Sequence, residues 1–133
     1  MAQTIRPLDL AQTYIALSRD GAATPHAGGP AFWSLPDDRL QALGGDWLVS
    51  EFVCDADWPS WEMHPDADEM VYLVEGDADL LLEMPEGVQT VRLCGRGAVI
   101  VPQGIWHTAH VRARSRLLHI TMGKGTQSRP AAR

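Results

Sequence analysis

The residues best suited to chemistry lie between positions 58 and 76. Glu62 and His64 are two residues apart, so on an extended strand both side chains leave the same face. Glu69 would point the other way on an unbroken strand, but residues 65–68, Pro-Asp-Ala-Asp, have the composition of a turn that lets the chain fold back. One imidazole and two carboxylates then converge, which is the kind of ligand set that a divalent transition metal requires. The alternative is a solvated surface loop, the more common setting for a His between two Glu.

A second cluster of potential ligands lies in residues 97–111. An apolar run ends in the turn formed by residues 102–104, Pro-Gln-Gly, and a new strand begins at Ile105 and carries His107. Each cluster therefore combines a strand, a turn and a second strand, and presents polar donors from an otherwise apolar segment. Two such units predict one shared pocket.

The remaining histidines are sorted by the side of the strand on which they lie. If His107 points inward, His110 points to the opposite face, so we do not expect His110 to be a ligand. His119 lies between two apolar residues on the last predicted strand and shares a face with Leu117 and Thr121. It is either a hydrogen-bonded core residue or a residue of the pocket. His26 lies in a loop and is either a solvated residue or part of a lid over the pocket.

Three tryptophans, Trp58, Trp61 and Trp106, flank the two clusters. Their rings either pack in the core or an interface, or form an aromatic wall for a small substrate, and both roles can hold together. We expect Trp61, Trp106 and His119 to be pocket residues.

The two clusters resemble the two motifs of the cupins. The first cupin motif is His-x-His, three or four residues, Glu, six residues and Gly. In this chain Glu62-x-His64, four residues, Glu69, six residues and Gly76 reproduces it in every place except the first.

The second cupin motif is Gly, five residues, Pro-x-Gly-x-x-His, three residues and Asn. Its centre is matched by Pro-x-Gly-x-x-His at residues 102–107, while the leading Gly is displaced by one position, to Gly95 or Gly97, and the position of the Asn holds Val111. The resemblance runs from about residue 46 to residue 122, and two spaced motifs in the right order are more specific than either alone.

The resemblance also implies a ligand set. Cupins hold their metal with the two His and the Glu of the first motif and the His of the second, and these roles carry over to His64, Glu69 and His107, with Glu62 where a His is expected. Two carboxylates facing a dication leave the complex near neutral. The additional hard oxygen favours Fe(II), Mn(II), Zn(II) or Ni(II) over Cu(I).

From residue 46 the chain consists of short β-prone runs separated by turn residues, without β-α-β alternation. We expect about eight strands, at residues 47–54, 58–63, 69–75, 77–84, 88–93, 98–101, 105–112 and 116–122. This pattern predicts an all-β sandwich or barrel, and the resemblance implies the cupin double-stranded β-helix, a jelly-roll barrel. Exposed apolar faces at Tyr72 and residues 80–82 would favour burial in a homodimer.

The 133 residues are expected to form a single domain. Residues 1–45 form a short, mostly irregular N-terminal extension, residues 46–122 the β-barrel core and residues 123–133 a flexible tail. Within the extension, the apolar periodicity of residues 8–17 fits a short helix and an edge strand equally well. Residues 36–45 carry start and stop signals of a helix of one or two turns.

Composition excludes several classes of function. The chain is 45% hydrophobic and 21% charged, which is ordinary for a globular protein. Its net charge of −6 would repel a nucleic acid or an anionic membrane surface, so we expect neither as a partner. Cys54 and Cys94 belong to no Cys-x-x-Cys pair and are expected to be reduced thiols. The start of the chain lacks the basic and apolar segments of a signal peptide, so we expect a cytoplasmic protein.

The sequence therefore predicts a small cupin with a divalent metal ion in the barrel and a small-molecule ligand. As an enzyme it would be a metal-dependent dioxygenase or isomerase acting on a small polar metabolite, but the fold does not choose the reaction, and no catalytic residue is identified. The alternative is a non-catalytic binding or sensory cupin without a tightly bound metal, which the missing motif His keeps open.

Overall fold

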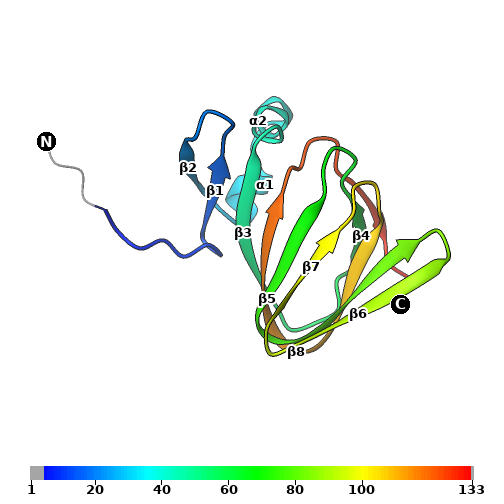
Figure 1. The fold of residues 1–133 in the computed structure, drawn as a ribbon. Helices are drawn as coiled ribbons and strands as arrows, with labels where there is room; N and C mark the ends of the chain where they lie inside the picture. Colours follow the sequence, from blue (N-terminus) through cyan, green and yellow to red (C-terminus); the bar gives the residue numbers. More distant parts are fainter. Residues whose placement is uncertain (1–4, 133) are drawn as a thin grey trace, which may run out of the picture.

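A computed structural model describes residues 5–132, and strands dominate it (Figure 1). The all-β class expected from the sequence is confirmed. The elements in chain order are β1 (Thr13–Leu17), β2 (Ala23–Ala27), α1 (Pro30–Trp33), α2 (Asp37–Leu43), β3 (Trp47–Cys54), β4 (Ser60–Met63), β5 (Glu69–Met84), β6 (Gly87–Cys94), β7 (Gly97–Val101), β8 (His107–Thr121) and β9 (Gln127–Pro130).

All strand pairs are antiparallel, and two long strands connect the barrel. The sheet runs in the order β2-β1-β3-β8-β4-β9, while β5 pairs with β6, β7 and β8. The strands expected at residues 69–75 and 77–84 are one continuous strand, β5, and those at 105–112 and 116–122 are one strand, β8. The residues that looked like turns between them are irregularities within paired strands, because the β5–β8 register shifts between Leu73 and Ala78.

Gly76 is the residue that lets β5 turn this corner against β8. Its φ is +119°, and a Cβ placed there would lie 2.4 Å from Ser115 Oγ and 2.7 Å from the Arg114 carbonyl oxygen. The buried Ser115 hydroxyl in turn accepts a hydrogen bond from the Asp77 backbone N–H and donates one to the Ala113 carbonyl. Only glycine combines this backbone conformation with so close an approach of two strands.

The irregularity also changes which residues of β5 face the interior. Before the corner the buried positions are odd-numbered, Glu69, Val71 and Leu73, and after it they are even-numbered, with Leu80 and Leu82 buried. A strand of regular period two cannot do this, so the register shift at the corner keeps both halves of β5 facing one core. It also places the Glu69 carboxylate on the inner face.

The burial of Leu80 and Leu82 changes the surface on which the homodimer was expected to form. Leu80 and Leu82 belong to the core, so they do not form the exposed face that residues 80–82 were expected to present. Exposed apolar side chains lie elsewhere, on Val88 of β6 and Ile100 of β7. Tyr72 and Leu81 are only partly buried, so the homodimer stays a prediction that keeps part of its original reason.

The N-terminal region extends the sheet. Of the two alternatives for residues 8–17, the strand is the one observed: β1 pairs with β2 and β3 and buries Tyr14 and Ala16. The helix expected within residues 36–45 is α2, and Figure 1 shows both helices beside this hairpin at one end of the molecule. The part of the chain that the structure describes contains no helix with the length and apolar character needed to cross a membrane.

The C-terminal segment differs from the flexible tail expected at residues 123–133. Gln127–Pro130 form β9, which pairs with β4 from Ser60 to Met63. The guanidinium of Arg129 lies 4.4 Å from the centre of the Trp106 ring and 5.5 Å from that of Trp61, and also forms an ion pair with Glu83. Cation–π contacts of this kind stabilise the segment against the barrel.

We predict that Gly76→Ala lowers the free energy of unfolding far more than Gly87→Ala. Both glycines have φ near +120° (119° and 127°), but nothing lies within 4 Å of a Cβ at Gly87. The control therefore costs about 1–3 kcal/mol of backbone strain, and Gly76→Ala costs a further ~1–3 kcal/mol of steric overlap. Urea denaturation measures both, and equal losses would contradict the role given to the corner.

Candidate metal centre

The two sequence clusters are hydrogen-bonded to each other. The Gly104 backbone N–H donates to the His64 carbonyl at 2.9 Å, and the Gln103 backbone N–H donates to the Asp68 carboxylate at 2.8 Å. The Gln103 side-chain amide donates to the Pro65 carbonyl at 2.6 Å. The turn expected between β4 and β5 is therefore held by the turn that precedes β8, and both deliver their side chains to one place.

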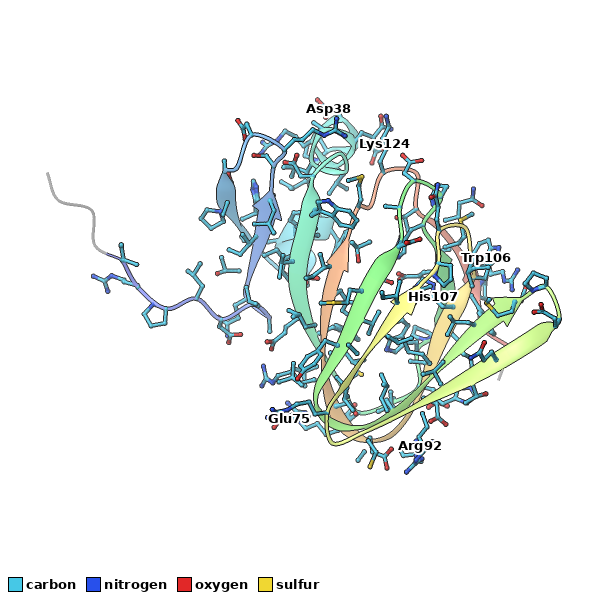
Figure 2. The ribbon with its side chains drawn as sticks, in the orientation of Figure 1. Asp38, Glu75, Arg92, Trp106, His107 and Lys124 are labelled. Atoms are coloured by element: carbon cyan, nitrogen blue, oxygen red, sulfur yellow. The ribbon has the colours of Figure 1, made fainter. Side chains whose placement is uncertain are left out.

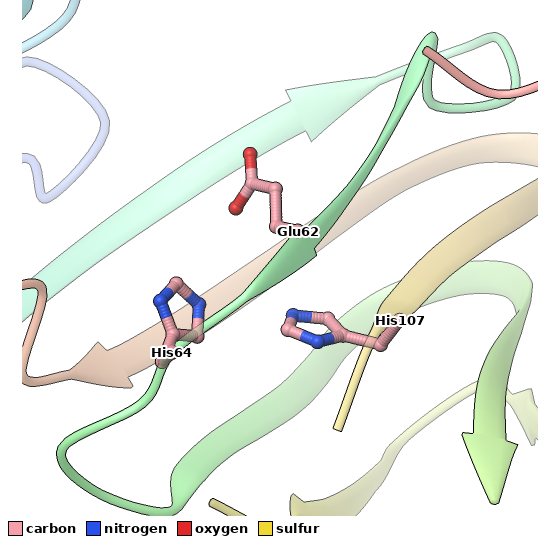
Figure 3. Close-up of side chains that lie close together, drawn as sticks. All are labelled: Glu62, His64 and His107. Carbon is pink, nitrogen blue, oxygen red and sulfur yellow. The ribbon is translucent and has the colours of Figure 1, made fainter. Parts of the chain in front are cut away.

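Strand register brings Glu62 to His107. The two residues are direct antiparallel partners on β4 and β8, so their side chains leave the same face of the sheet. His64 follows Glu62 by two residues, just beyond the end of β4. Glu62, His64 and His107 each offer a ligand atom, and these atoms all lie within 4.8 Å of one another (Figure 3). They form a possible metal site.

Glu69 adds a second carboxylate to this group. Its Oε1 lies 3.0 Å from His107 Nε2 and 3.5 Å from His64 Nε2. His64, Glu69 and His107 are 6%, 4% and 1% exposed, and among the described residues these three facing atoms have no correctly aligned hydrogen-bond partner. Buried polar atoms are almost always satisfied, so three unsatisfied ones aimed at each other indicate a site shaped for a cation.

The tautomer of His107 agrees with a ligand role. Its Nδ1 lies 3.1 Å from the Ile105 carbonyl oxygen. A carbonyl only accepts hydrogen bonds, so Nδ1 carries the proton and donates, which leaves the lone pair of the neutral ring on Nε2. Nε2 is the atom that faces Glu69 and His64.

His64 is oriented in the same way by Thr126. The Thr126 hydroxyl donates its one proton to the Gly123 carbonyl at 2.7 Å, and its oxygen lies 2.8 Å from His64 Nδ1. Nδ1 must therefore be the donor to this oxygen, and the lone pair of His64 also lies on Nε2. Partners of this kind fix the ring orientation of metal-binding histidines.

The outer oxygen of Glu69 is held by two residues of β8. The Thr121 hydroxyl donates to Oε2, and His119 Nδ1 lies 3.4 Å from the same atom. His119 and Thr121 share the face that the sequence assigned to them. These contacts leave Oε1 to point at the two Nε2 atoms, so the carboxylate presents one oxygen to the site and uses the other as its anchor.

The electrostatics of this group favour a positive charge between its members. Burial alone would raise the pKa of Glu69, but the imidazoles of His107, His119 and His64 outweigh it and hold this pKa well below its ordinary value. Burial likewise opposes a charged His107, but Glu69 outweighs it and raises the pKa of His107. The Glu69 carboxylate is thus kept anionic, which is the form that a metal ion requires.

The group opens into a cavity of about 510 Å³, a volume typical of small-molecule sites. Glu62, His64, Glu69 and His119 line it, and Trp58 lies beside His119 with the ring centres 5.7 Å apart. His119, one of the expected pocket residues, therefore faces the cavity.

Trp61 and Trp106 are not placed as expected, because neither is among the residues that line the cavity. Trp61 alternates with Ser60 and Glu62, which do line it, and so projects from the other face of β4. Both rings contact Arg129 instead. His26 is also absent from the lining and lies against Phe32, with ring centres 6.3 Å apart.

Sequence reasoning missed two residues that orient the site, Thr121 and Thr126. The alternation along β8 placed Thr121 on the face of His119, so a signal for it existed. Thr126 gave none, because its contact with His64 spans 62 residues and depends on the segment that precedes β9.

No family model and no curated protein matches the chain, but solved structures do. The Bacillus subtilis oxalate decarboxylase matches with a TM-score of 0.50 and 14% identity, over 63% of this chain and 23% of that one. Peruvianin-I, a cysteine peptidase from Thevetia peruviana latex, matches with a TM-score of 0.54 and 16% identity, over 65% of this chain and 57% of that one.

A cupin-2 domain containing protein from Shewanella frigidimarina matches with a TM-score of 0.48 and 18% identity, over 56% of this chain and 68% of that one. This chain thus spans between about a quarter and two thirds of the length of these three chains. At such identities the likeness shows the fold alone, which is similar to the folds of Peruvianin-I and oxalate decarboxylase and agrees with the β-barrel that the sequence motifs predicted.

We predict that Thr126→Val weakens metal binding by about 10- to 100-fold, since it removes the acceptor that orients His64 while keeping the shape of the side chain. Thr126→Ser retains the hydroxyl and should restore most of the affinity. Competition with a chromophoric chelator measures both. Wild-type affinity in a folded Thr126→Val protein would show that Thr126 does not position His64.

Proposed function

We propose that this protein is a metal-dependent enzyme that holds a divalent ion with His64, Glu69, His107 and Glu62 and acts on a small molecule in the adjoining cavity. The observation that carries the proposal is the set of three buried ligand atoms, His64 Nε2, Glu69 Oε1 and His107 Nε2. They face one another without aligned hydrogen bonds within residues 5–132. A dication would satisfy all three at once.

The donor set narrows the choice of metal. Two imidazole nitrogens and two carboxylate oxygens suit Mn(II), Fe(II), Zn(II) or Ni(II), and two carboxylates balance the charge of the ion. Oxalate decarboxylase, which has a similar fold, has Mn(II) centres, which makes Mn(II) a suitable first metal to test. When bound, such an ion supplies a Lewis acid that polarises an oxygen of the ligand.

The protein's own residues would supply binding and proton transfer. Glu62 and His119 both line the cavity, and Glu62 is less buried than the other three ligand residues. The carboxylate oxygen of Glu62 that does not bind the ion can take a proton from a bound ligand and return it to a neighbouring atom, as an isomerase requires. The same open arrangement would also serve a dioxygenase, and measuring oxygen consumption separates the two.

The second candidate is a non-catalytic protein that binds a small molecule in the same cavity. One observation favours it: the first position of the metal motif is Glu62, a partly exposed carboxylate, instead of a His. A binding protein without a tight metal would retain ligand affinity after treatment with a chelator.

We predict that protein purified without added metal contains close to one equivalent of a transition metal, and that His107→Ala loses most of it. Removing a ligand from a small mononuclear site takes away a large share of the affinity. His110→Ala is the matched control, because His110 lies on the same strand, β8, but not in the ligand group. Elemental analysis measures all three proteins.

Two results would count against the proposal. Wild-type protein without metal, even after incubation with Mn(II), Fe(II), Zn(II) or Ni(II), would support the binding protein instead. Equal metal loss in His107→Ala and His110→Ala would show that the ligand group is misassigned.

A further inference from the structure

The wall of the cavity differs from its base. The base holds the polar group of Glu62, His64, Glu69 and His119, whereas the wall is largely apolar and aromatic. Its apolar members are Tyr14, Trp33, Leu48, Phe52, Trp58 and Pro59. Trp33 and Phe52 are 61% and 50% exposed, so large apolar rings remain open to solvent at this cavity. Exposed aromatic surface of this kind is typical of a ligand site.

The cavity offers no cation to an anionic ligand. Within residues 5–132, no Lys or Arg lines it. Arg116 lies near the cavity because it contacts the lining residue Glu51. Its guanidinium is already engaged in ion pairs with Glu51 at 2.7 Å and with Glu75 at 3.4 Å, so it is not free to pair with a ligand. Lys124 borders a separate neighbouring cavity of about 320 Å³. Figure 2 shows Arg92 and Glu75 at the end of the molecule opposite Lys124.

The charge balance at the base of the cavity also disfavours an anionic ligand. A dication held by Glu62 and Glu69 is formally neutralised by them, and the protein as a whole carries a net charge of −6. An anionic ligand such as a dicarboxylate or a sugar phosphate would therefore meet neither a net positive site nor a side chain that pairs with its charge. The cost of desolvating its charge in this cavity would be offset only by contact with an ion that Glu62 and Glu69 already neutralise.

From these observations we infer that the ligand is an uncharged small molecule with an apolar, ring-bearing body and oxygen atoms at one end. The oxygens would lie at the polar base, and the ring would pack against Phe52, Trp58 and Leu48. This inference rests on the proposed metal site and narrows its expected ligand from a small polar metabolite to an amphipathic one. It also separates this cavity from a site for a dianion such as oxalate.

The test compares three probes on Zn(II)-loaded protein by isothermal titration calorimetry. Catechol has a ring and two adjacent oxygens, ethylene glycol has the oxygens without the ring, and oxalate has the oxygens with two negative charges. Catechol should bind at least about tenfold more tightly than either of the others. Treating the protein with a chelator should weaken catechol binding by a similar factor.

A matched pair of variants on β3 tests the wall. Phe52→Ala should weaken catechol binding about fivefold or more while metal content stays unchanged. Trp47→Ala removes an exposed aromatic side chain from the same strand that does not line the cavity, and should change binding by less than about twofold. The comparison of probes on wild-type protein remains decisive if Phe52→Ala does not fold.

Metal content is measured first, so that the two ideas fail separately. A protein that takes up no metal contradicts the proposed function. A metal-loaded protein that binds oxalate as tightly as catechol, or in which Phe52→Ala and Trp47→Ala behave alike, overturns only the inference about the ligand. A third result would also overturn the inference about the ligand. If catechol does not bind, and light scattering and crosslinking show a dimer that covers Phe52, the apolar wall is an interface with a second copy of the chain.

Discussion

The structure depends on burying the Glu69 carboxylate against the unprotonated nitrogens of two histidines. Oε1 of Glu69 lies 3.0 Å from His107 Nε2. The Ile105 carbonyl orients the ring of His107 and the Thr126 hydroxyl that of His64, so that the lone pair on each Nε2 points inward. Without a positive charge between them, three acceptors would face one another in a buried site, which costs several kcal/mol. A metal ion, or a proton on one imidazole, removes this cost, and only the metal satisfies all three atoms.

The fold supplies the conditions for this arrangement. The corner at Gly76 shifts β5 so that Glu69, Val71 and Leu73 share the interior with the residues beyond it. The register of β4 against β8 sets Glu62 opposite His107, and the segment before β9 brings Thr126 to His64. The ligands therefore come from three parts of the chain, the end of β4, the start of β5 and the start of β8, and the hydrogen-bonded strands keep them together.

Much of this was predictable from the sequence, because it depends on local patterns. Strand alternation and turn composition gave the β runs, the return of Glu69 toward His64 and the inward face of His119. The parts that were not predictable depend on long-range pairing. Gly76 was read as a turn residue, because its role in a continuous strand depends on the contact with Ser115 that forms only when β5 pairs with β8. Residues 123–133 were predicted to be flexible, because β9 has no apolar alternation of its own. Trp61 and Trp106 were assigned to the pocket because they flank the two clusters, and nothing local indicated their contact with Arg129.

The proposed metal centre requires that Glu62 help to hold a dication, and the melting temperature of Glu62→Gln tests this requirement most directly. In protein never exposed to a chelator, Glu62→Gln should melt below the wild type, because it binds the stabilising metal at least about tenfold more weakly. After chelation the difference in melting temperature should disappear, because no bound metal then remains for Glu62 to hold. A higher melting temperature for Glu62→Gln in protein never exposed to a chelator would contradict this requirement and favour a metal-free binding protein.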